Sequence, residues 1–265
     1  MLQYGYPDFT PLPAIDIIGT LPLAQFGAPD FTIDTGETGL SLSGSDLELG
    51  RRLNWPTAWT RIGKVFFHDS PDSSTPHMEL ASVGAGASAT VDNTRANSKS
   101  YSYKLTTGAG VGHTASVYRD FPGTPSMKIG FGLWFWYDGT DDHISFTIRH
   151  LSGTELTVLG LVFYPASKEW FYLDNAGVEQ TLGTLSPDPT QLLGWHFIQL
   201  VVDLTAQAYV RVVAGTTLQV LTASGQVTPD ATTGPELRII TTIRDDVGVG
   251  MDWWVDDIIL TYDEL

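Results

Sequence analysis

Short apolar runs rich in branched and aromatic residues dominate the last two thirds of the chain. The clearest lie at 128–137, 196–204, 207–213 and 252–262. Their length and their content of Val, Ile and aromatic residues predict β-strands rather than helices. The run at 128–137 is apolar at both odd and even positions, which predicts a central strand that is buried on both faces.

Turn residues separate these runs at the spacing of a β-sandwich. Thr205, Ala206 and Gln207 join two of the runs, which predicts an antiparallel hairpin. Gly, Pro and Asn interrupt the other apolar stretches in the same way. We expect little helix, with 189–193 the best candidate for a single helical turn. Further strands are expected near 64–69, 88–91, 100–106, 113–121, 143–150, 156–163, 169–173, 218–222 and 236–242.

The first part of the chain has a different character. Prolines at 7, 11, 13, 22 and 29 disfavour helix and central strand, and no helical periodicity accompanies them. Alternating leucines between 34 and 49 predict short half-buried strands. We therefore expect an extended N-terminal arm over 1–63 and one β-sandwich domain over 64–265.

The arm contains a short internal echo. The pattern aromatic-Gly-x-Pro-Asp-Phe-Thr occurs at 4–10 and again at 26–32. One interpretation is a pair of docking turns whose aromatic side chains bury in matching grooves on neighbouring subunits. The other is coincidental turn chemistry, in which proline presets the turn and aspartate bonds its own backbone. Under the first interpretation the docking residues are Tyr4, Tyr6, Pro7, Phe9, Phe26, Pro29 and Phe31.

Composition narrows the classes of partner. Fourteen basic residues stand against 30 acidic ones, for a formal net charge of −16. This balance disfavours binding to nucleic acid or to an anionic membrane surface, because both interactions depend on Lys and Arg. The chain contains no cysteine, so disulfides and thiolate metal sites are excluded. No apolar run reaches the ~20 residues of a membrane span. The N-terminus lacks the pattern of a secretory signal, so we expect synthesis in the cytoplasm.

Three blocks of the sequence carry a resemblance to a known superfamily. They are the aromatic run 129–138, the hairpin 194–213 and the closing run 252–261, with a weaker fourth block at 100–109. Together they resemble the concanavalin A-like lectin/glucanase superfamily, and within it the laminin-G-like jelly rolls, over about residues 65 to 262. The resemblance implies an all-β fold, a two-sheet antiparallel jelly-roll sandwich. This fold hosts lectins, hydrolases, adhesion modules and virion proteins alike, so it does not fix an activity.

The sequence lacks the motifs of several enzyme classes. Retaining hydrolases of this superfamily carry a Glu-x-Asp-x-x-Glu run, which is absent here; only Asp46 and Glu48 have even the two-residue spacing. No two histidines have the short spacing of a local zinc motif, and no Gly-x-Ser-x-Gly elbow occurs. The glycines of 108–112 lack the lysine of a phosphate loop. We expect no enzymatic activity.

The resemblance also implies a structural calcium site. Many jelly-roll binding modules hold calcium between an acidic residue near the first sandwich strand and an aspartate of the last strand, which here correspond to Asp69 and Asp256. The family often has a glutamate after its first block, where this chain has His68-Asp69-Ser70. The alternative is that Asp256 and Asp257 form a strand-edge pair, one pointing in and one out. No other cofactor is expected.

Aromatic residues offer two interpretations. Trp134 and Trp136 share one face of a strand whose other face is also apolar, which favours core packing over a sugar-stacking platform. Trp170 lies beside Lys168 and Glu169, so we predict it to be exposed and, with Tyr172, to contact a glycan.

Two functions remain as hypotheses. The first is a non-enzymatic virion protein, a bacteriophage head decoration or tail-associated component that docks through its arm onto a homo-oligomer or onto capsid or tail proteins. The missing signal sequence, the missing cysteines and the proline-rich arm, which is similar to N-terminal segments of phage minor structural proteins, support it. The alternative is a carbohydrate-binding module or lectin that uses exposed aromatic side chains.

Overall fold

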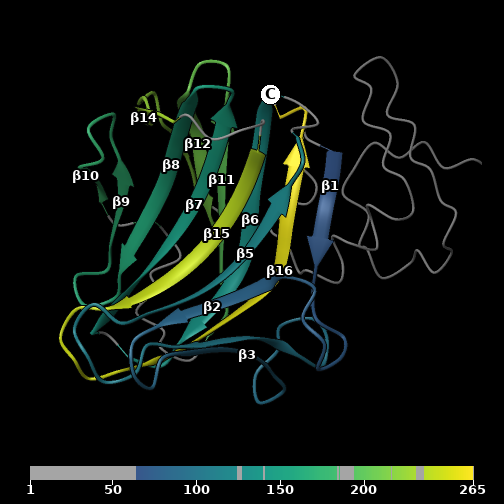
Figure 1. Cartoon of the computed structure of the whole chain (residues 1–265), viewed down its shortest axis with the longest axis vertical. Helices are drawn as coiled ribbons and strands as arrows, with labels where there is room; N and C mark the ends of the chain where they lie inside the picture. The colour runs from purple at the N-terminus through teal and green to yellow at the C-terminus, as the bar shows by residue number, and fades with distance from the viewer. Residues whose placement is uncertain are drawn as a thin grey trace, which may run out of the picture. The chain divides into compact units, whose positions relative to one another are not determined.

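The computed structural model describes residues 64–123, 127–139, 141–183, 185, 194–215, 217–230 and 236–264. These residues form two antiparallel sheets of eight strands each, packed face to face. Figure 1 shows β8, β7 and β15 of one sheet in front of β12, β11 and β6 of the other. The expected all-β two-sheet sandwich is confirmed.

The sheet that contains β6, here called the β6 sheet, has the order β13-β12-β11-β6-β16-β4-β3. Strand β1 also pairs with β16, beyond the point where β4 ends. The bounds of its strands are β1 (Lys64–Asp69), β3 (Ser88–Asp92), β4 (Ser102–Thr106), β6 (Lys128–Tyr137), β11 (His196–Asp203), β12 (Ala208–Ala214), β13 (Thr217–Val220) and β16 (Asp252–Tyr262).

The sheet that contains β7, here called the β7 sheet, has the order β10-β9-β8-β7-β15-β5-β2, and β14 pairs with β8. Its central pair, β7 and β15, stays in continuous register from Glu236 opposite Leu151 to Asp245 opposite Asp142. The bounds of its strands are β2 (Glu79–Val83), β5 (Thr114–Phe121), β7 (Asp142–Ser152), β8 (Glu155–Tyr164), β9 (Glu169–Leu173), β10 (Glu179–Gly183), β14 (Gln226–Pro229) and β15 (Glu236–Asp245).

Alternate residues of both sheets fill the space between them. Successive side chains of a strand point to opposite faces, so each strand gives every second residue to the core. Aromatic rings form its centre: Phe135 lies 5.5 Å from Phe146 between ring centroids, and Tyr137 lies 4.9 Å from Trp253. The largest side chains that are fully buried are Trp253, Tyr103, Tyr137, Phe135, Phe146 and Phe163.

Each strand predicted within the described residues is present, and three further strands of the β7 sheet were not predicted. The predicted hairpin is β11 and β12, and the predicted run at 128–137 is β6. Strands β2, β10 and β14 were not predicted, because none of them has an alternating apolar pattern. The arm at 1–63, with its echo and its short strands, and the helical turn predicted at 189–193 lie outside the described residues. None of the described residues form a helix with the length and hydropathy of a membrane span.

The β6 sheet also buries side chains on its outer face. Trp134, Phe197, Val213 and Ile259 form a second apolar cluster there, with Val65 and Trp195 packed against it. Strand β6 is therefore apolar on both faces, and the prediction that Trp134 packs in a core rather than on an exposed platform is confirmed. Trp136 on the same face is half-buried and lies 6.0 Å from Trp195.

A buried polar cluster lies on the same outer face. The Thr261 hydroxyl donates to the carbonyl of Gly130 at 3.2 Å and also bonds the Glu264 carboxylate, which Arg211 pairs with from β12. A Cβ on Gly130 would lie 2.4 Å from Thr261 Oγ1 and 2.9 Å from the side-chain nitrogen of Gln199. Only glycine fits at this position of β6 while Thr261 stands opposite.

Candidate functional site

On the outer face of the β7 sheet, short side chains, most of them polar, lie between aromatic side chains at either side; we call this middle part the floor. On β15 and β7 the outward positions in the middle of the sheet carry the hydroxyl residues Thr242, Ser145 and Thr147 and the apolar Ile240, all half-buried. Ser116 of β5 extends this floor, and its hydroxyl lies 2.9 Å from the hydroxyl of Thr242. Gly160 of β8 continues it on the other side, next to Thr147. The short side chains leave hydroxyl groups on this face for a ligand, whereas the backbone groups of Gly160 are bonded to the Tyr209 hydroxyl.

Tyr118 on β5 borders one side of the floor. Its hydroxyl is hydrogen-bonded to Glu79, and this bond is the main reason that the pKa of Tyr118 is raised. The Arg238 guanidinium lies 4.9 Å from the centre of the Tyr118 ring and binds Asp120 through two nitrogen atoms, with Nη2 2.6 Å from Oδ2. Tyrosine, arginine and two carboxylates are thus fixed in one arrangement.

Tyr164 of β8 and Phe171 of β9 border the opposite side. Their rings meet edge to face with centroids 5.4 Å apart. The Tyr164 hydroxyl donates to both oxygens of Glu179, at 3.1 and 3.0 Å. Burial, followed by this bond, raises the pKa of Tyr164, so the phenol stays neutral at physiological pH. An oriented, neutral phenol and an apolar ring side by side suit a ligand with both polar and apolar faces.

His143 of β7 lies next to Tyr164, with ring centroids 4.9 Å apart. Its Nδ1 is 2.6 Å from Oδ2 of Asp246, whose other oxygen lies 3.8 Å from Arg244. Asp246 therefore orients the imidazole and leaves Nε2 of His143 pointing away from this contact.

Five carboxylates are described on this face, and a neighbouring side chain engages four of them; the fifth, Glu169, lies opposite Tyr164 at the start of β9. Glu79 bonds Tyr118, Asp120 binds Arg238, Asp246 bonds His143 and Glu179 bonds Tyr164. Glycoside hydrolysis needs a proton-donating carboxyl and a second carboxylate on either side of one bond. The four engaged carboxylates hold aromatic and basic groups in place.

The predicted glycan contacts differ from those on this face. Trp170 is 2% exposed and packs in the core against Phe163, with centroids 4.8 Å apart, so the prediction that it is exposed is wrong. Tyr172, two residues on, points to the same side and packs against Tyr209. The polar residues Lys168 and Glu169 belong to the turn and strand start, and the outward ring of this strand is Phe171.

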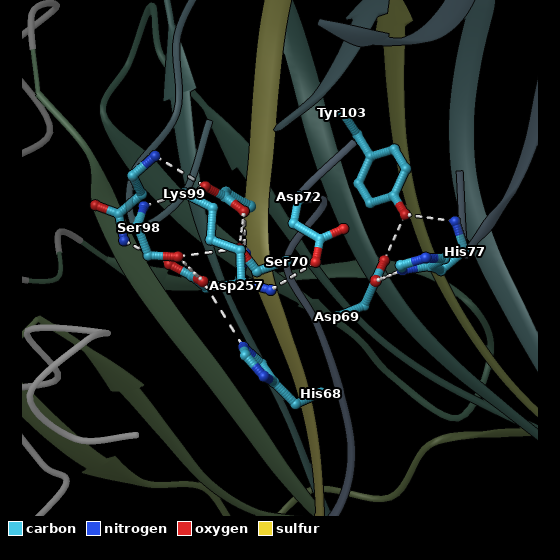
Figure 2. A network of polar contacts seen from close by, with 11 residues as sticks. His68, Asp69, Ser70, Asp72, His77, Ser98, Lys99, Tyr103 and Asp257 are labelled. Atoms are coloured by element: carbon cyan, nitrogen blue, oxygen red, sulfur yellow. Dashed lines mark hydrogen bonds and ion pairs between the residues drawn. The ribbon is translucent and has the colours of Figure 1, made fainter. Parts of the chain in front are cut away.

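The predicted calcium ligands lie in a polar network next to β1 and β16 (Figure 2). Asp69, 3% exposed, accepts a hydrogen bond from the Tyr103 hydroxyl and lies 2.9 Å from Nδ1 of His77. The same hydroxyl accepts the backbone N–H groups of His77 and Met78. These contacts satisfy both oxygens of Asp69 and fix the loop that precedes β2.

Asp256 has a separate set of partners. It accepts hydrogen bonds from the Ser70 hydroxyl at 3.0 Å, from the backbone N–H of Asn97 at 2.8 Å and from that of Asp257 at 2.8 Å. Burial, with the charge of Asp257 second, raises the pKa of Asp256 to about 7. The carboxylate thus holds the loop between β3 and β4 against β16.

Asp256 and Asp257 are both buried against the loop at 97–98, so the alternative of one inward and one outward side chain is wrong. Both are fully buried. The pairing of β16 with β6 shifts between Asp256 and Ile259, and Asp257 has φ 49°, in the left-handed region that aspartate tolerates. This bulge turns the Asp257 carboxylate toward Asn97 Nδ2, at 2.7 Å, and toward the Ser98 hydroxyl.

The donors around Asp69 and Asp256 do not form a calcium cage. Calcium takes six to eight oxygen ligands, whereas N–H and O–H groups point at these carboxylates. Figure 2 shows Asp69 with Tyr103 and His77 on one side, apart from Asp257 with Ser98 and His68 on the other. Among the described residues, no three acidic or histidine side chains are grouped as metal ligands. We derive no role for calcium from this arrangement.

Neither a protein-family model nor a curated protein matches this sequence. Solved structures do match it. An endo-β-1,4-glucuronan lyase from the fungus Trichoderma reesei has 9% identity and a TM-score of 0.53 over 75% of this chain and 96% of that chain. A Bacillus subtilis protein of unknown function with a galectin-like fold has 8% identity and a TM-score of 0.52 over 76% and 97%. A Bacillus licheniformis β-glucanase has 11% identity and a TM-score of 0.46 over 75% and 98%. The chain has the concanavalin A-like jelly-roll fold, and at these identities the likeness concerns the fold alone.

Proposed function

We propose that this protein binds a glycan chain across the outer face of the β7 sheet. The observation that carries the proposal is the floor of hydroxyl side chains, with Ile240 among them, between Tyr118 on one side and Tyr164 with Phe171 on the other. Sugars present hydroxyl groups at their edges and C–H groups on their faces. The floor offers hydrogen-bond partners for the sugar hydroxyl groups, and the aromatic rings offer stacking surfaces for the C–H faces.

The dimensions of the face favour a chain over a single sugar. Tyr118 on β5 and Phe171 on β9 are separated by four strand spacings, through β15, β7 and β8. At ~4.8 Å per spacing, this distance is about 19 Å. A ligand that contacts both borders must extend across the strands.

The fold supports the same class of ligand. The structures that resemble this one include a glucuronan lyase, and a protein with a galectin-like fold. Sandwiches of this kind host many functions, so their names support the ligand class and do not assign an activity.

Ring-removing variants test the proposal. We expect Tyr164→Ala and Phe171→Ala each to weaken binding to a polysaccharide by about tenfold, which corresponds to ~1.4 kcal/mol. Affinity electrophoresis against a panel of soluble polysaccharides identifies a binder, and titration calorimetry measures the affinity. The matched control is Phe66→Ala, which removes an exposed ring from β1 of the other sheet.

Two results decide between binding and the alternatives. The proposal is contradicted if no polysaccharide in the panel binds, or if the three variants bind equally well. The same mixtures are followed for polymer length by size-exclusion chromatography. We expect unchanged length, and shortening of the polymer would show an enzyme.

The virion role predicted from the N-terminal arm stays a prediction. Its docking residues, Tyr4 to Phe31, lie outside the described residues. The two roles are compatible, since a protein of an assembly can display a glycan-binding face.

A further inference from the structure

The outer face of the β7 sheet holds two arginines side by side. Arg149 of β7 is the direct cross-strand partner of Arg238 of β15. Side chains at directly opposed positions have Cβ atoms about 5 Å apart, and like charges placed there destabilise a sheet. Such a pair is stable only if counter-charges accompany it.

Arg238 has its counter-charge within the protein. Asp120, its cross-strand partner on β5, binds the guanidinium through both carboxylate oxygens, and the Tyr118 ring lies beneath it. Near the end of β15, Arg244 forms an ion pair with Asp246, and His143 of β7 pairs with the same carboxylate. Three of the four basic side chains on the outward positions of β7 and β15 are therefore matched by acidic ones.

Arg149 is the exception. Arg149 is half-buried, and within the described part of the chain its guanidinium has neither a carboxylate partner nor a hydrogen-bond acceptor. Its cross-strand neighbour on β8 is Val158, and the next outward residue of β7 is Thr147, so neither supplies a charge. A like charge directly opposite is unfavourable, and a ligand anion at Arg149 would offset the repulsion from Arg238.

We propose that Arg149 binds the carboxylate of a uronic acid residue in the glycan chain. The inference rests on the proposed function, because Thr147 and Gly160, next to Arg149, belong to the floor on which the glycan lies. The pair Arg238–Asp120 shows the geometry: the planar guanidinium takes a carboxylate through two parallel N–H bonds. Arg149 offers the same group on the neighbouring strand β7, where it is the next outward residue after Thr147 of the floor.

The charge of the whole chain makes the proposal specific. A formal net charge of −16 repels a polyanion at long range. Repulsion is screened beyond a Debye length of about 8 Å at physiological ionic strength, so a local contact can still form. Binding of an acidic polymer by this protein therefore requires a site and does not follow from general attraction.

The test compares four polymers by titration calorimetry on the full chain. They are a polyuronate, the same polyuronate with its carboxylates methyl-esterified, a neutral glucan and a sulfated glucan. We expect the wild type to bind the polyuronate at least tenfold more tightly than its methyl ester. Arg149→Gln should lose this preference, and Arg149→Lys should keep part of it. Arg119→Gln, which removes an arginine bound to the His77 carbonyl, is the matched charge control and should bind as the wild type does.

Thermal unfolding gives a second measurement that does not depend on affinity. At low salt we expect Arg149→Gln to have a higher Tm than the wild type, because it relieves repulsion with Arg238. At one fixed concentration, polyuronate should raise the Tm of the wild type by more than that of Arg149→Gln, and the methyl ester should raise both Tm values equally.

The outcomes separate the two proposals. If the methyl ester or the neutral glucan binds as tightly as the polyuronate, or if Arg149→Gln binds the polyuronate as the wild type does, glycan binding stands and the role of Arg149 is wrong. If only the sulfated glucan binds, the site takes sulfate and the uronate proposal fails. If none of the four polymers binds, both proposals fail.

Discussion

Asp256 is the residue whose ionisation the fold constrains most clearly. Its carboxyl is fully buried next to Asp257, and burial raises its pKa to about 7. An aspartate in an unfolded chain has a pKa of about 3.9. Between these two values the folded state binds a proton that the unfolded state does not. This group therefore contributes stability that is complete below about pH 4 and is lost as the pH rises through about 7.

We expect Asp256→Asn to flatten this pH dependence. The free energy of unfolding of the wild type should fall more steeply from pH 5 to pH 8 than that of the variant, by up to about 1.4 kcal/mol per pH unit. Urea unfolding at four pH values in this range measures the slope. Asp263→Asn, which changes an exposed carboxylate paired with Lys64, is the control and should keep the slope of the wild type.

Neighbouring groups must be held constant in this measurement. Asp257 adjoins Asp256, and Nε2 of His68 lies 3.7 Å from Asp257. Repeating the comparison in a His68→Gln background removes the titration of the imidazole. Equal slopes for Asp256→Asn and its parent in both backgrounds would show that Asp256 is ionised throughout the range.

Single side-chain orientations were the hardest features to predict from the sequence. Lys168 and Glu169 made Trp170 look exposed, yet Trp170 shares the inward face of β9 with Tyr172. Polar neighbours in the sequence do not reveal which face of the strand a side chain occupies when a turn directly precedes that strand. Asp257 escaped prediction for a related reason, since a bulge in β16 rotates it out of the alternating pattern.

At the scale of strands, Tyr209 connects the two sheets through one hydroxyl. From β12 it accepts the backbone N–H of Gly160 at 2.8 Å and lies 2.8 Å from the carbonyl of Leu173 on β9. It thereby bonds backbone groups of β8 and β9 at the point where their mutual pairing ends. The side chain is buried, with 3% exposed.

Tyr209→Phe should destabilise the protein by about 1 to 3 kcal/mol. The change leaves a buried N–H and a buried carbonyl without a partner while keeping the ring in place. Chemical denaturation measures the loss. Tyr262→Phe, whose ring packs near Phe66 and Lys64 at the surface end of β16, should lose much less. A comparable loss in both variants would argue against the bridging role.

Strands with a strong apolar pattern were predictable, and the candidate site was not. Strands β6, β9 and β16 have the predicted bounds, because aromatic and branched residues fill them between clear turns. The candidate site on the outer face of the β7 sheet depends on the register between segments far apart in the sequence, such as β5 beside β15 and β15 beside β7. The outward alternation of Tyr118 with Asp120 was a usable local signal. The sequence contains no local signal for the pairing of Arg149 with Arg238, which lie on different strands.

At the scale of the whole molecule, the N-terminal arm offers a direct test of assembly. We expect the full chain to self-associate and a chain that begins at Lys64 to be a folded monomer, because a proline-rich apolar arm needs another surface to pack on. Size-exclusion chromatography with light scattering measures both masses. Circular dichroism confirms that the shorter chain keeps its strands. Identical monomers would remove the main support for the virion role.

The apolar character of β6 on both faces has a consequence for how the chain finds its native pairing. In most sandwich strands a slip by one residue exposes the core face to water, and the hydrophobic effect corrects the error. A slipped β6 would still bury aromatic side chains on both sides. A slip by one residue would place Gly130 and Gly132 at core positions and would separate Gly130 from Thr261, which stands opposite it. Small residues and a polar contact therefore fix the register of β6 with its neighbours.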